Sequence, residues 1–246
     1  MLIHPTVEKL SQLRLTGMVK ALEEQGRMAD VEALGFEERL GLLVDREETE
    51  RGNRRLQRRL RKAKLRHSAS IEDIDFRYPR GLDKSLMLEL SQCRWVGEHL
   101  NVLLTGSTGV GKSYIACALA QKACREGYTS AYQRISRLFE ELNLAKGDGR
   151  YGKLLGSLAK TDLLVLDDFG LSKLTNEQCH DLLEIMEERH GLKSTIITSQ
   201  LPVKQWHDVM GNPTLADAIL DRLVHNAYKI DMKGESMRKR INLDLI

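Results

Sequence analysis

Apolar residues recur at helical spacing through the first part of the chain. Near the N-terminus, Leu15, Val19 and Leu22 lie three or four positions apart, a spacing that places side chains on one helix face. The same spacing resumes at Phe36 and continues toward a strongly polar segment. Few strand-like patterns interrupt it. We therefore predict that residues 1–69 form a small all-α domain.

From about residue 100 the pattern changes to short apolar runs separated by longer amphipathic segments. The expected strands are 101–105, 129–132, 163–166 and 194–198, and the expected helices are 113–126, 135–146, 151–159 and 176–190. Short buried strands that alternate with helices form parallel sheets with helices on both faces. We place the domain boundary near residue 70 and predict an α/β domain over residues 70–246.

A glycine-rich motif lies between the first expected strand and the helix after it. It consists of Gly106, Ser107, Thr108, Gly109, Val110, Gly111, Lys112 and Ser113. In this context the backbone amides and the positive helix N-terminus surround phosphate groups. Lys112 is expected to reach the β and γ oxygens of ATP, and Ser113 to bind Mg²⁺. The alternative is a glycine turn followed by a surface lysine.

Two carboxylates follow the apolar strand at 163–166. Asp167 and Asp168 come directly after it, and a parallel sheet delivers such residues to the edge that carries the glycine loop. Asp167 is expected to hold Mg²⁺ through water, and Asp168 to orient or deprotonate the attacking water. A turn capped by Asp167 is the alternative.

The net charge of the chain is only +3, but basic residues are concentrated in the segment 51–66. Glu47 and Glu50 precede arginines by four positions, so one long helix is expected to run into this segment. The nine basic residues among these sixteen are Arg51, Arg54, Arg55, Arg58, Arg59, Arg61, Lys62, Lys64 and Arg66, and no acidic residue separates them. Such a run predicts binding to double-stranded DNA through phosphates, with little sequence selectivity. A solvated helix face is the alternative.

The composition bears on disulfides, metal sites and the cell compartment of the protein. The four cysteines are scattered and the seven histidines show no ligand spacing, so neither disulfides nor a zinc site is expected. No apolar run approaches the roughly 18–20 residues of a transmembrane helix, and the N-terminus has no signal-peptide pattern. We expect a cytoplasmic protein with no membrane partner.

The two phosphate-site motifs resemble those of the AAA+ ATPases, in which the second motif usually reads Asp-Glu. Asp168 replaces that glutamate and is one methylene shorter, which implies slow hydrolysis. The run 196–200 resembles the family's sensor-one strand, whose polar end contacts the γ-phosphate or its water. Thr198 and Ser199 are the candidates for this catalytic contact, and ordinary capping at a strand end is the alternative for either one.

Two arginines near the end of the chain resemble further AAA+ features. Arg222, within 220–223, resembles the arginine finger that reaches a neighbouring subunit's ATP, which implies a homo-oligomer; a surface Asp–Arg pair is the alternative. Arg238, within 234–239, resembles the second sensor, which contacts phosphate in helicase loaders. The chain ends at Ile246, so the usual helical lid is not expected.

The order of these features resembles the replication-initiator and helicase-loader clade of AAA+ proteins. A helical insert between residues 132 and 163 is one such feature. Within the clade, the chain most resembles the IstB family of insertion-sequence helper ATPases, an impression strengthened by the segments 15–18, 71–76 and 81–84. The resemblance implies assembly on target DNA with ATP, and stimulation of a partner transposase.

Two other functions are consistent with the glycine motif. A replicative helicase loader would carry the same ATPase motifs and bind a helicase. A small-molecule kinase would share the phosphate loop but has no need for the basic segment 51–66 or for Arg222.

Overall fold

The computed structural model describes residues 5–28 and 31–237. The chain forms two compact units, Met1–Arg58 and Arg59–Ile246. We call them the helical unit and the α/β unit. The division falls inside the long helix α3, earlier in the chain than the boundary predicted near residue 70.

The helical unit is built from short helices and the first part of a long one. They are α1 (Pro5–Gln12), α2 (Thr16–Gln25), the 3-10 turn η1 (Val31–Ala33) and α3 (Phe36–Ala63), which ends in the α/β unit. Arg14 takes a left-handed φ of 59°, which separates α1 from α2. The long helix predicted to enter the basic segment is α3, with 28 residues.

A buried carboxylate connects α2 and α3 within the helical unit. Glu47 is 5% exposed and accepts hydrogen bonds from the backbone N–H of Gly17, at 2.6 Å, and of Met18, at 3.3 Å. A Cβ on Gly17 would lie 2.5 Å from the Cα of Glu47, so the two helices approach at a distance that only glycine allows. Among the described residues of this unit, Ala21 is the single buried apolar side chain.

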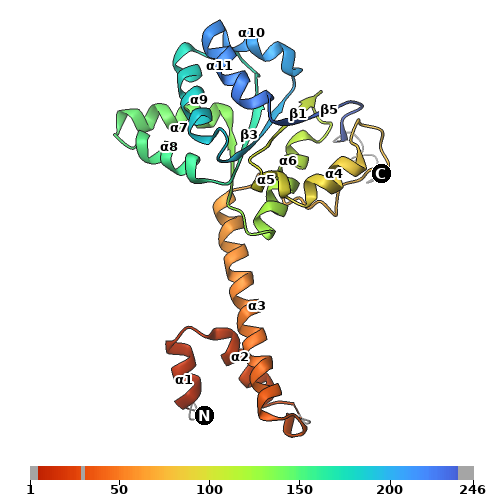
Figure 1. Cartoon of the computed structure of the whole chain (residues 1–246), viewed down its shortest axis with the longest axis vertical. Coiled ribbons are helices and arrows are strands. Elements are labelled where there is room, and N and C mark those ends of the chain that lie inside the picture. The colour runs from red at the N-terminus through yellow and green to blue at the C-terminus, as the bar shows by residue number, and fades with distance from the viewer. Residues whose placement is uncertain (1–4, 29–30, 238–246) are drawn as a thin grey trace, which may run out of the picture. The chain divides into compact units, whose positions relative to one another are not determined.

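The α/β unit alternates strands and helices (Figure 1). In chain order its further elements are α4 (Lys84–Ser91), α5 (Arg94–Gly97), β1 (Asn101–Gly106), α6 (Lys112–Arg125), β2 (Ser130–Arg134), α7 (Ile135–Gly147), α8 (Tyr151–Lys160), β3 (Leu163–Phe169), α9 (Asn176–Arg189), β4 (Ser194–Ser199), η2 (Val203–Gln205), α10 (Trp206–Met210), α11 (Pro213–Val224) and β5 (Ala227–Met232). The four predicted strands and four predicted helices are all present. The remaining elements, among them β5, were not predicted.

The five strands form one parallel sheet in the order β2-β3-β4-β1-β5. Because the strands are parallel, the segments that follow β1, β3 and β4 all leave the sheet at its carboxyl edge. The sheet therefore brings the glycine loop after β1 and the two aspartates of β3 to the same edge, on either side of β4.

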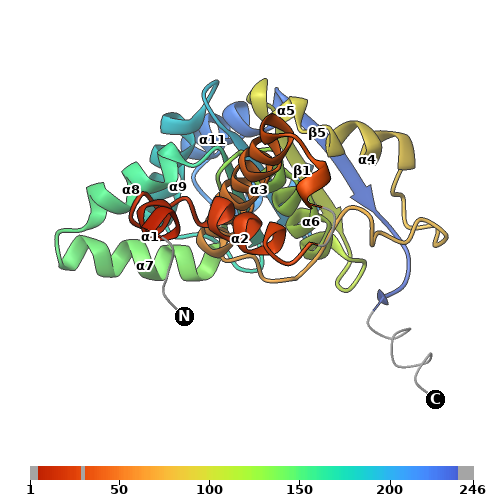
Figure 2. The same cartoon turned by 90° about the horizontal axis from the view of Figure 1, so that it is seen from below.

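Side chains alternate between two hydrophobic clusters on opposite faces of the sheet. On β1, Val102 and Leu104 pack in the cluster that includes α4, α5 and α6, whereas Leu103 packs in the cluster that includes α7–α11. On β4, Ile196 and Ile197 divide in the same way. Figure 2 shows helices on both faces of the sheet. The predicted three-layer α/β architecture is confirmed.

Two predictions about composition can be compared with the structure. All four cysteines are buried and free of disulfides. In the part of the chain that the structure describes, no helix has the length and apolar character needed to cross a membrane.

Candidate active site

The glycine loop joins β1 to α6 and folds back on its own backbone. Gly109 has a φ of 88°, and a Cβ there would lie 2.1 Å from the Oγ of Ser236, so the loop requires glycine at this point. The ammonium of Lys112 donates to the carbonyl oxygens of Gly106, at 2.7 Å, and Ser107, at 2.8 Å. Lys112 is only 7% exposed and lies at the N-terminus of α6. Lys112 lines the cavity beside the loop, together with Gly109, Gly111 and Ser113, where a phosphate-binding lysine is expected.

The two residues predicted to hold Mg²⁺ contact each other directly. The Ser113 hydroxyl donates to Asp167 Oδ1 at 2.7 Å, although 54 positions separate the residues. Mg²⁺ prefers oxygen ligands and in nucleotide sites takes one or two from the protein, with phosphate and water supplying the rest. The converging hydroxyl and carboxylate fit this requirement. A cluster of three or more acidic, His or Cys ligands does not occur among the described residues.

Asp167 is fully buried at the end of β3. Burial alone would raise the pKa of its carboxyl group, but hydrogen bonds from Thr198, Tyr132 and Ser113 outweigh this effect and lower the pKa below its ordinary value. The nearby charge of Arg66 acts in the same direction. Asp167 is therefore held as a carboxylate, the form that binds a cation.

Asp168 has an unusual backbone conformation. Its φ is 64°, in the left-handed region, and the pairing register between β3 and β4 shifts between Leu166 and Phe169. Non-glycine residues in this region are uncommon and are found at functional sites. The side chain accepts a hydrogen bond from Arg134 Nε at 2.8 Å and lines the cavity beside the glycine loop.

The two sensor-one candidates have different surroundings. The Thr198 hydroxyl donates to Asp167 Oδ1 at 2.5 Å and accepts from the backbone N–H of Asp168 at 3.1 Å. The Ser199 hydroxyl is buried and donates instead to the Phe169 carbonyl at 2.7 Å. The next residue, Gln200, lines the cavity and accepts from Thr108 at 2.8 Å. Sequence reasoning missed Gln200, although it is the first polar side chain beyond the strand end.

A cavity of about 410 Å³ lies against the glycine loop, within the usual size range of ligand pockets. Besides loop residues, Asp168 and Gln200, its lining residues are His67, Asp73, Asp75, Arg80, Tyr114 and Met237. Four of these precede the sheet in sequence. Arg80 is 7% exposed and donates to the Val110 carbonyl at 3.2 Å, which fixes the segment before α4 against the loop. The sequence patterns 71–76 and 81–84 supported the family resemblance, but they assigned this segment no role at the nucleotide site.

The segment after β5 also contacts the glycine loop. The backbone N–H of Met237 donates to the Gly109 carbonyl at 2.9 Å, and the Ser107 hydroxyl donates to the Gly234 carbonyl at 3.5 Å. Arg238, the predicted second sensor, lies outside the described residues. The residues just before Arg238, from Gly234 to Met237, thus contact the glycine loop.

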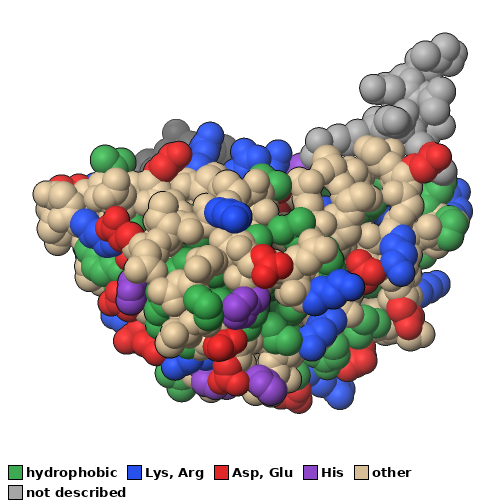
Figure 3. Space-filling model, turned by 90° about the horizontal axis from the view of Figure 1, so that it is seen from above, with side chains coloured by type: hydrophobic (Ala, Val, Ile, Leu, Met, Phe, Trp, Pro, Cys, Tyr) green, Lys and Arg blue, Asp and Glu red, His purple; other side chains and the backbone are tan. Residues whose placement is uncertain are grey.

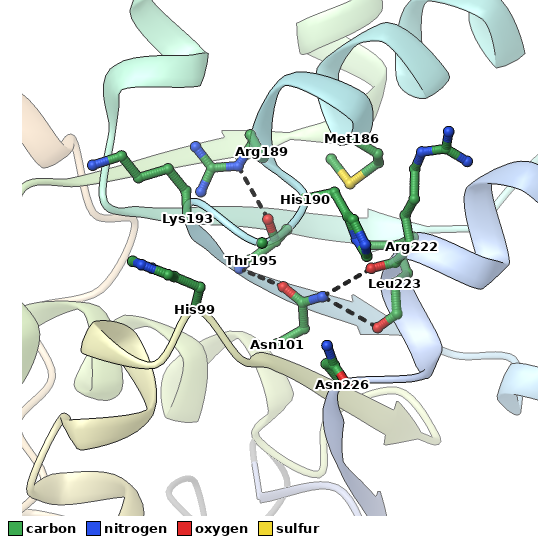
Figure 4. Close-up of a pocket in the computed structure, with 11 residues that line it drawn as sticks. His99, Asn101, Met186, Arg189, His190, Lys193, Thr195, Arg222, Leu223 and Asn226 are labelled. Atoms are coloured by element: carbon green, nitrogen blue, oxygen red, sulfur yellow. Dashed lines mark hydrogen bonds between the residues drawn. The ribbon is translucent and has the colours of Figure 1, made fainter.

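Arg222 lies at the opposite edge of the sheet from the glycine loop. Asn101, the first residue of β1, donates to the carbonyl oxygens of Arg222 and Leu223, both at 3.3 Å (Figure 4). The guanidinium extends away from Asn101 in that view and forms an ion pair with Glu187 at 2.8 Å. The six-residue strand β1, about 17 Å long, separates this edge from the chain's own phosphate loop. Arg222 is therefore placed far from the nucleotide site of its own chain.

The predicted DNA-binding residues fall into two groups. Four of the nine contact other groups in the protein: Arg51 and Arg54 pair with Glu47, Arg59 donates to the Cys124 carbonyl, and Arg66 lies 3.4 Å from Asp167. The others are exposed on or just after α3, namely Arg55, Arg58, Arg61, Lys62 and Lys64. Figure 3 shows one face of the α/β unit, where Lys and Arg side chains are interspersed with acidic and histidine side chains. Exposed basic side chains with no acidic residue between them in sequence lie in the last part of α3 and just after it.

The sheet order, the glycine loop after β1 and the aspartates at the end of β3 together define a P-loop ATPase of the AAA+ type. The chain belongs to the family described as "IstB-like ATP binding protein", whose model matches residues 8–244. An insertion-sequence ATP-binding protein of Sinorhizobium fredii is 54% identical over 97% of this chain and 98% of its own length. The ATP-binding protein of insertion sequence IS21 from Pseudomonas aeruginosa is 30% identical over 96% of this chain and 89% of its own length.

Two solved structures are similar to this chain in fold. The structure of DnaI covers 68% of this chain and 92% of its own, with a TM-score of 0.57 and 24% identity. The DnaC helicase loader covers 70% of this chain and all of its own, with a TM-score of 0.55 and 23% identity. At this identity the likeness establishes the fold alone, which the sequence had predicted.

Proposed function

We propose that this protein is a MgATP-hydrolysing helper that assembles on duplex DNA and stimulates a partner transposase. The observation that carries the proposal is the presence, in one chain, of a glycine loop beside the contacting pair Ser113 and Asp167, and of a helix whose last part carries exposed basic side chains. The names of the relatives, which are insertion-sequence ATP-binding proteins, support the assignment to transposition. Lys112 faces the phosphates, Ser113 and Asp167 hold Mg²⁺, and Asp168 positions the attacking water.

Phosphate contacts along α3 give affinity without base recognition. Arg55, Arg58 and Lys62 lie three and four positions apart, so they form a stripe along one helix face. Each phosphate neutralised by such a residue releases condensed counterions, which drives binding and makes it sensitive to salt. A helper that must act at many target sequences is suited to this kind of contact.

Arg222 supports assembly into a homo-oligomer. Because it lies at the edge opposite the glycine loop of its own chain, its guanidinium can meet a γ-phosphate only in another subunit. A cation supplied in this way stabilises the charge that develops during phosphoryl transfer. Assembly on DNA then completes the catalytic site, and hydrolysis weakens the assembly by removing the phosphate that the arginine contacts.

The test combines ATP hydrolysis and strand transfer with the full-length protein. Duplex DNA should increase the hydrolysis rate, and a partner transposase should insert element ends efficiently only when the protein and ATP are both present. Lys112→Ala should abolish ATP binding and both effects. Asp168→Asn should bind ATP but hydrolyse it about a hundredfold more slowly, the loss expected for a group that assists proton transfer.

Two outcomes would contradict the proposal. Hydrolysis that is indifferent to duplex DNA, together with insertion that is indifferent to the protein, would remove the transposition function. Tight binding to a replicative helicase under the same conditions would favour a helicase loader instead. The likeness to DnaI and DnaC does not decide between them, since it extends only to the fold.

A further inference from the structure

One arginine of the basic segment lies at the metal-binding carboxylates. The helix α3 ends at Ala63, and Lys64 takes a left-handed φ of 49°, which turns the chain away from the helix axis. Two residues later, Arg66 Nη1 lies 3.4 Å from Asp167 Oδ2 and 3.8 Å from Asp168 Oδ2. Its side chain is 39% exposed, so it approaches the site from the solvent side.

Among the described residues, several groups contact these two carboxylates directly. Asp167 Oδ1 accepts hydrogen bonds from Ser113 and Thr198, and Asp167 Oδ2 accepts one from Tyr132 and faces Arg66. Asp168 Oδ2 accepts from Arg134. The two carboxylates are therefore paired with two guanidinium groups, Arg66 and Arg134, in the absence of a metal.

A divalent cation changes this balance. Ser113 and Asp167 would hold Mg²⁺, whose two positive charges would repel the guanidinium of Arg66, because that group already lies 3.4 Å from Asp167 Oδ2. The metal and Arg66 therefore compete for the negative charge of Asp167. Phosphate oxygens that arrive with the metal bring further negative charge to the glycine loop, on the other side of Ser113.

We propose that Arg66 is the counter-ion that Mg²⁺ displaces from Asp167 when nucleotide is loaded, so that the end of α3 responds to the metal. This rests on the proposed function only in assigning Mg²⁺ to Ser113 and Asp167. Arg66 is thus a positioning residue of the nucleotide site and not a DNA contact in the metal-free state. Since the exposed residues that we assign to DNA lie on α3 just before it, DNA binding and metal loading act on the same segment and influence each other reciprocally.

The experiment measures the Mg²⁺ concentration that supports binding of a fluorescent ATP analogue to the full-length protein, without DNA. Arg66→Gln should lower the concentration required at half-saturation by about tenfold, because a competing unit charge a few ångströms from the metal is removed. Arg66→Lys keeps the charge and should stay close to the parent value. Arg94→Gln is the matched control, an exposed arginine of α5 before the opposite edge of the sheet.

A second readout follows the end of α3 directly. Tryptic cleavage after Lys64 should become faster in the parent protein when Mg²⁺ and the ATP analogue are both present, because Arg66 no longer anchors the segment. In Arg66→Gln, cleavage should be equally fast with or without metal. Circular dichroism melting of each variant establishes that it is folded.

Different outcomes would refute the displacement of Arg66 and the assignment of Mg²⁺ to Ser113 and Asp167. If Arg66→Gln needs as much Mg²⁺ as Arg94→Gln, or more, the displacement is refuted, since an arginine that helps to bind phosphate gives that result. If the parent protein binds the analogue equally well without any Mg²⁺, the metal site itself is wrongly assigned and the proposed function loses its support. Cleavage after Lys64 that does not respond to metal in the parent would also overturn the inference.

Discussion

The two units of this protein are stabilised in different ways. The α/β unit buries apolar side chains on both faces of its sheet, with Leu103 fully buried in one cluster and Ile115 in the other. In the described residues of the helical unit, Ala21 is the single buried apolar side chain, and the buried group that joins its helices is the carboxylate of Glu47. A sheet with two cores can fold by itself, whereas helices with so little apolar burial are marginal in water.

This difference is consistent with the proposed function. The nucleotide site needs fixed distances between the glycine loop and the aspartates, and a packed sheet provides them. A surface that follows the DNA backbone needs charge and can tolerate local opening, because regions of low stability supply the moving parts of proteins. We therefore expect mutations in the two units to have effects of different size and kind.

The largest expected effect follows from a cavity in the α/β unit. Leu103→Ala should lower the free energy of unfolding of that unit by roughly 2–5 kcal/mol, because the sheet cannot close around the missing side chain. Urea unfolding followed by tryptophan fluorescence measures the change, since both tryptophans, Trp95 and Trp206, lie in this unit. Leu192→Ala, at a side chain that is 61% exposed, should change it by less than about 0.5 kcal/mol.

A smaller effect, limited to the helical unit, is expected from Glu47→Gln. The loss of the charge weakens hydrogen bonds from Gly17 and Met18 and should destabilise α2 against α3 by roughly 1–3 kcal/mol. Burial by itself would raise the pKa of Glu47, but hydrogen bonds from Arg51, Gly17 and Met18 lower it below the ordinary value of 4.5. Because the folded-state pKa is lowered, the stabilisation is present above about pH 4.5 and is lost as the pH falls through the folded-state value.

Amide hydrogen exchange of Gly17 and Met18 at a series of pH values measures this contribution. In the parent protein their protection should fall more steeply below pH 4.5 than in the variant. A variant that keeps the parent's protection and the parent's pH profile would mean that Glu47 does not hold the two helices together.

The smallest effect on folding is expected from neutralising the exposed residues of α3. Changing Arg55, Arg58, Arg61 and Lys62 together to Gln should alter the free energy of unfolding by about 0.5 kcal/mol or less. The slope of log Kd against log salt on duplex DNA should instead decrease by about 0.9 for each phosphate that the variant no longer neutralises. ATP hydrolysis without DNA should be retained. An unchanged salt slope would mean that the stripe is only a solvated surface.

Sequence patterns predicted the central strands of the fold because those strands are buried on both faces. Unbroken apolar runs such as 163–166 have few other interpretations. The edge strand β5 was not predicted, because it alternates exposed residues such as Lys229 and Asp231 with buried ones, so no unbroken apolar run marks it. The short helix α4 was also missed, although Asp83 caps it by accepting from the backbone N–H of Ser85 and Leu86.

For the candidate nucleotide site, the sequence predicted only the residues that belong to local motifs. The loop 106–113 and Asp167 carry local sequence signals, and their proximity follows from the geometry of a parallel sheet. The convergence of Arg66, Tyr132 and Arg80 on this region depends on how the chain returns to the sheet over long sequence separations. From the basic segment we predicted only DNA binding for Arg66. In the structure its guanidinium lies beside Asp167 and Asp168.

The central claim, that assembly completes the catalytic site, is tested most directly by mixing two inactive variants. Arg222→Ala keeps the Lys112 pocket and Lys112→Ala keeps the arginine, so each alone should show no DNA-stimulated ATP hydrolysis. Mixed on duplex DNA, they should recover part of it, because some interfaces then join an intact pocket to an intact arginine. No recovery, when fluorescence energy transfer shows that the variants have assembled together, would contradict the account.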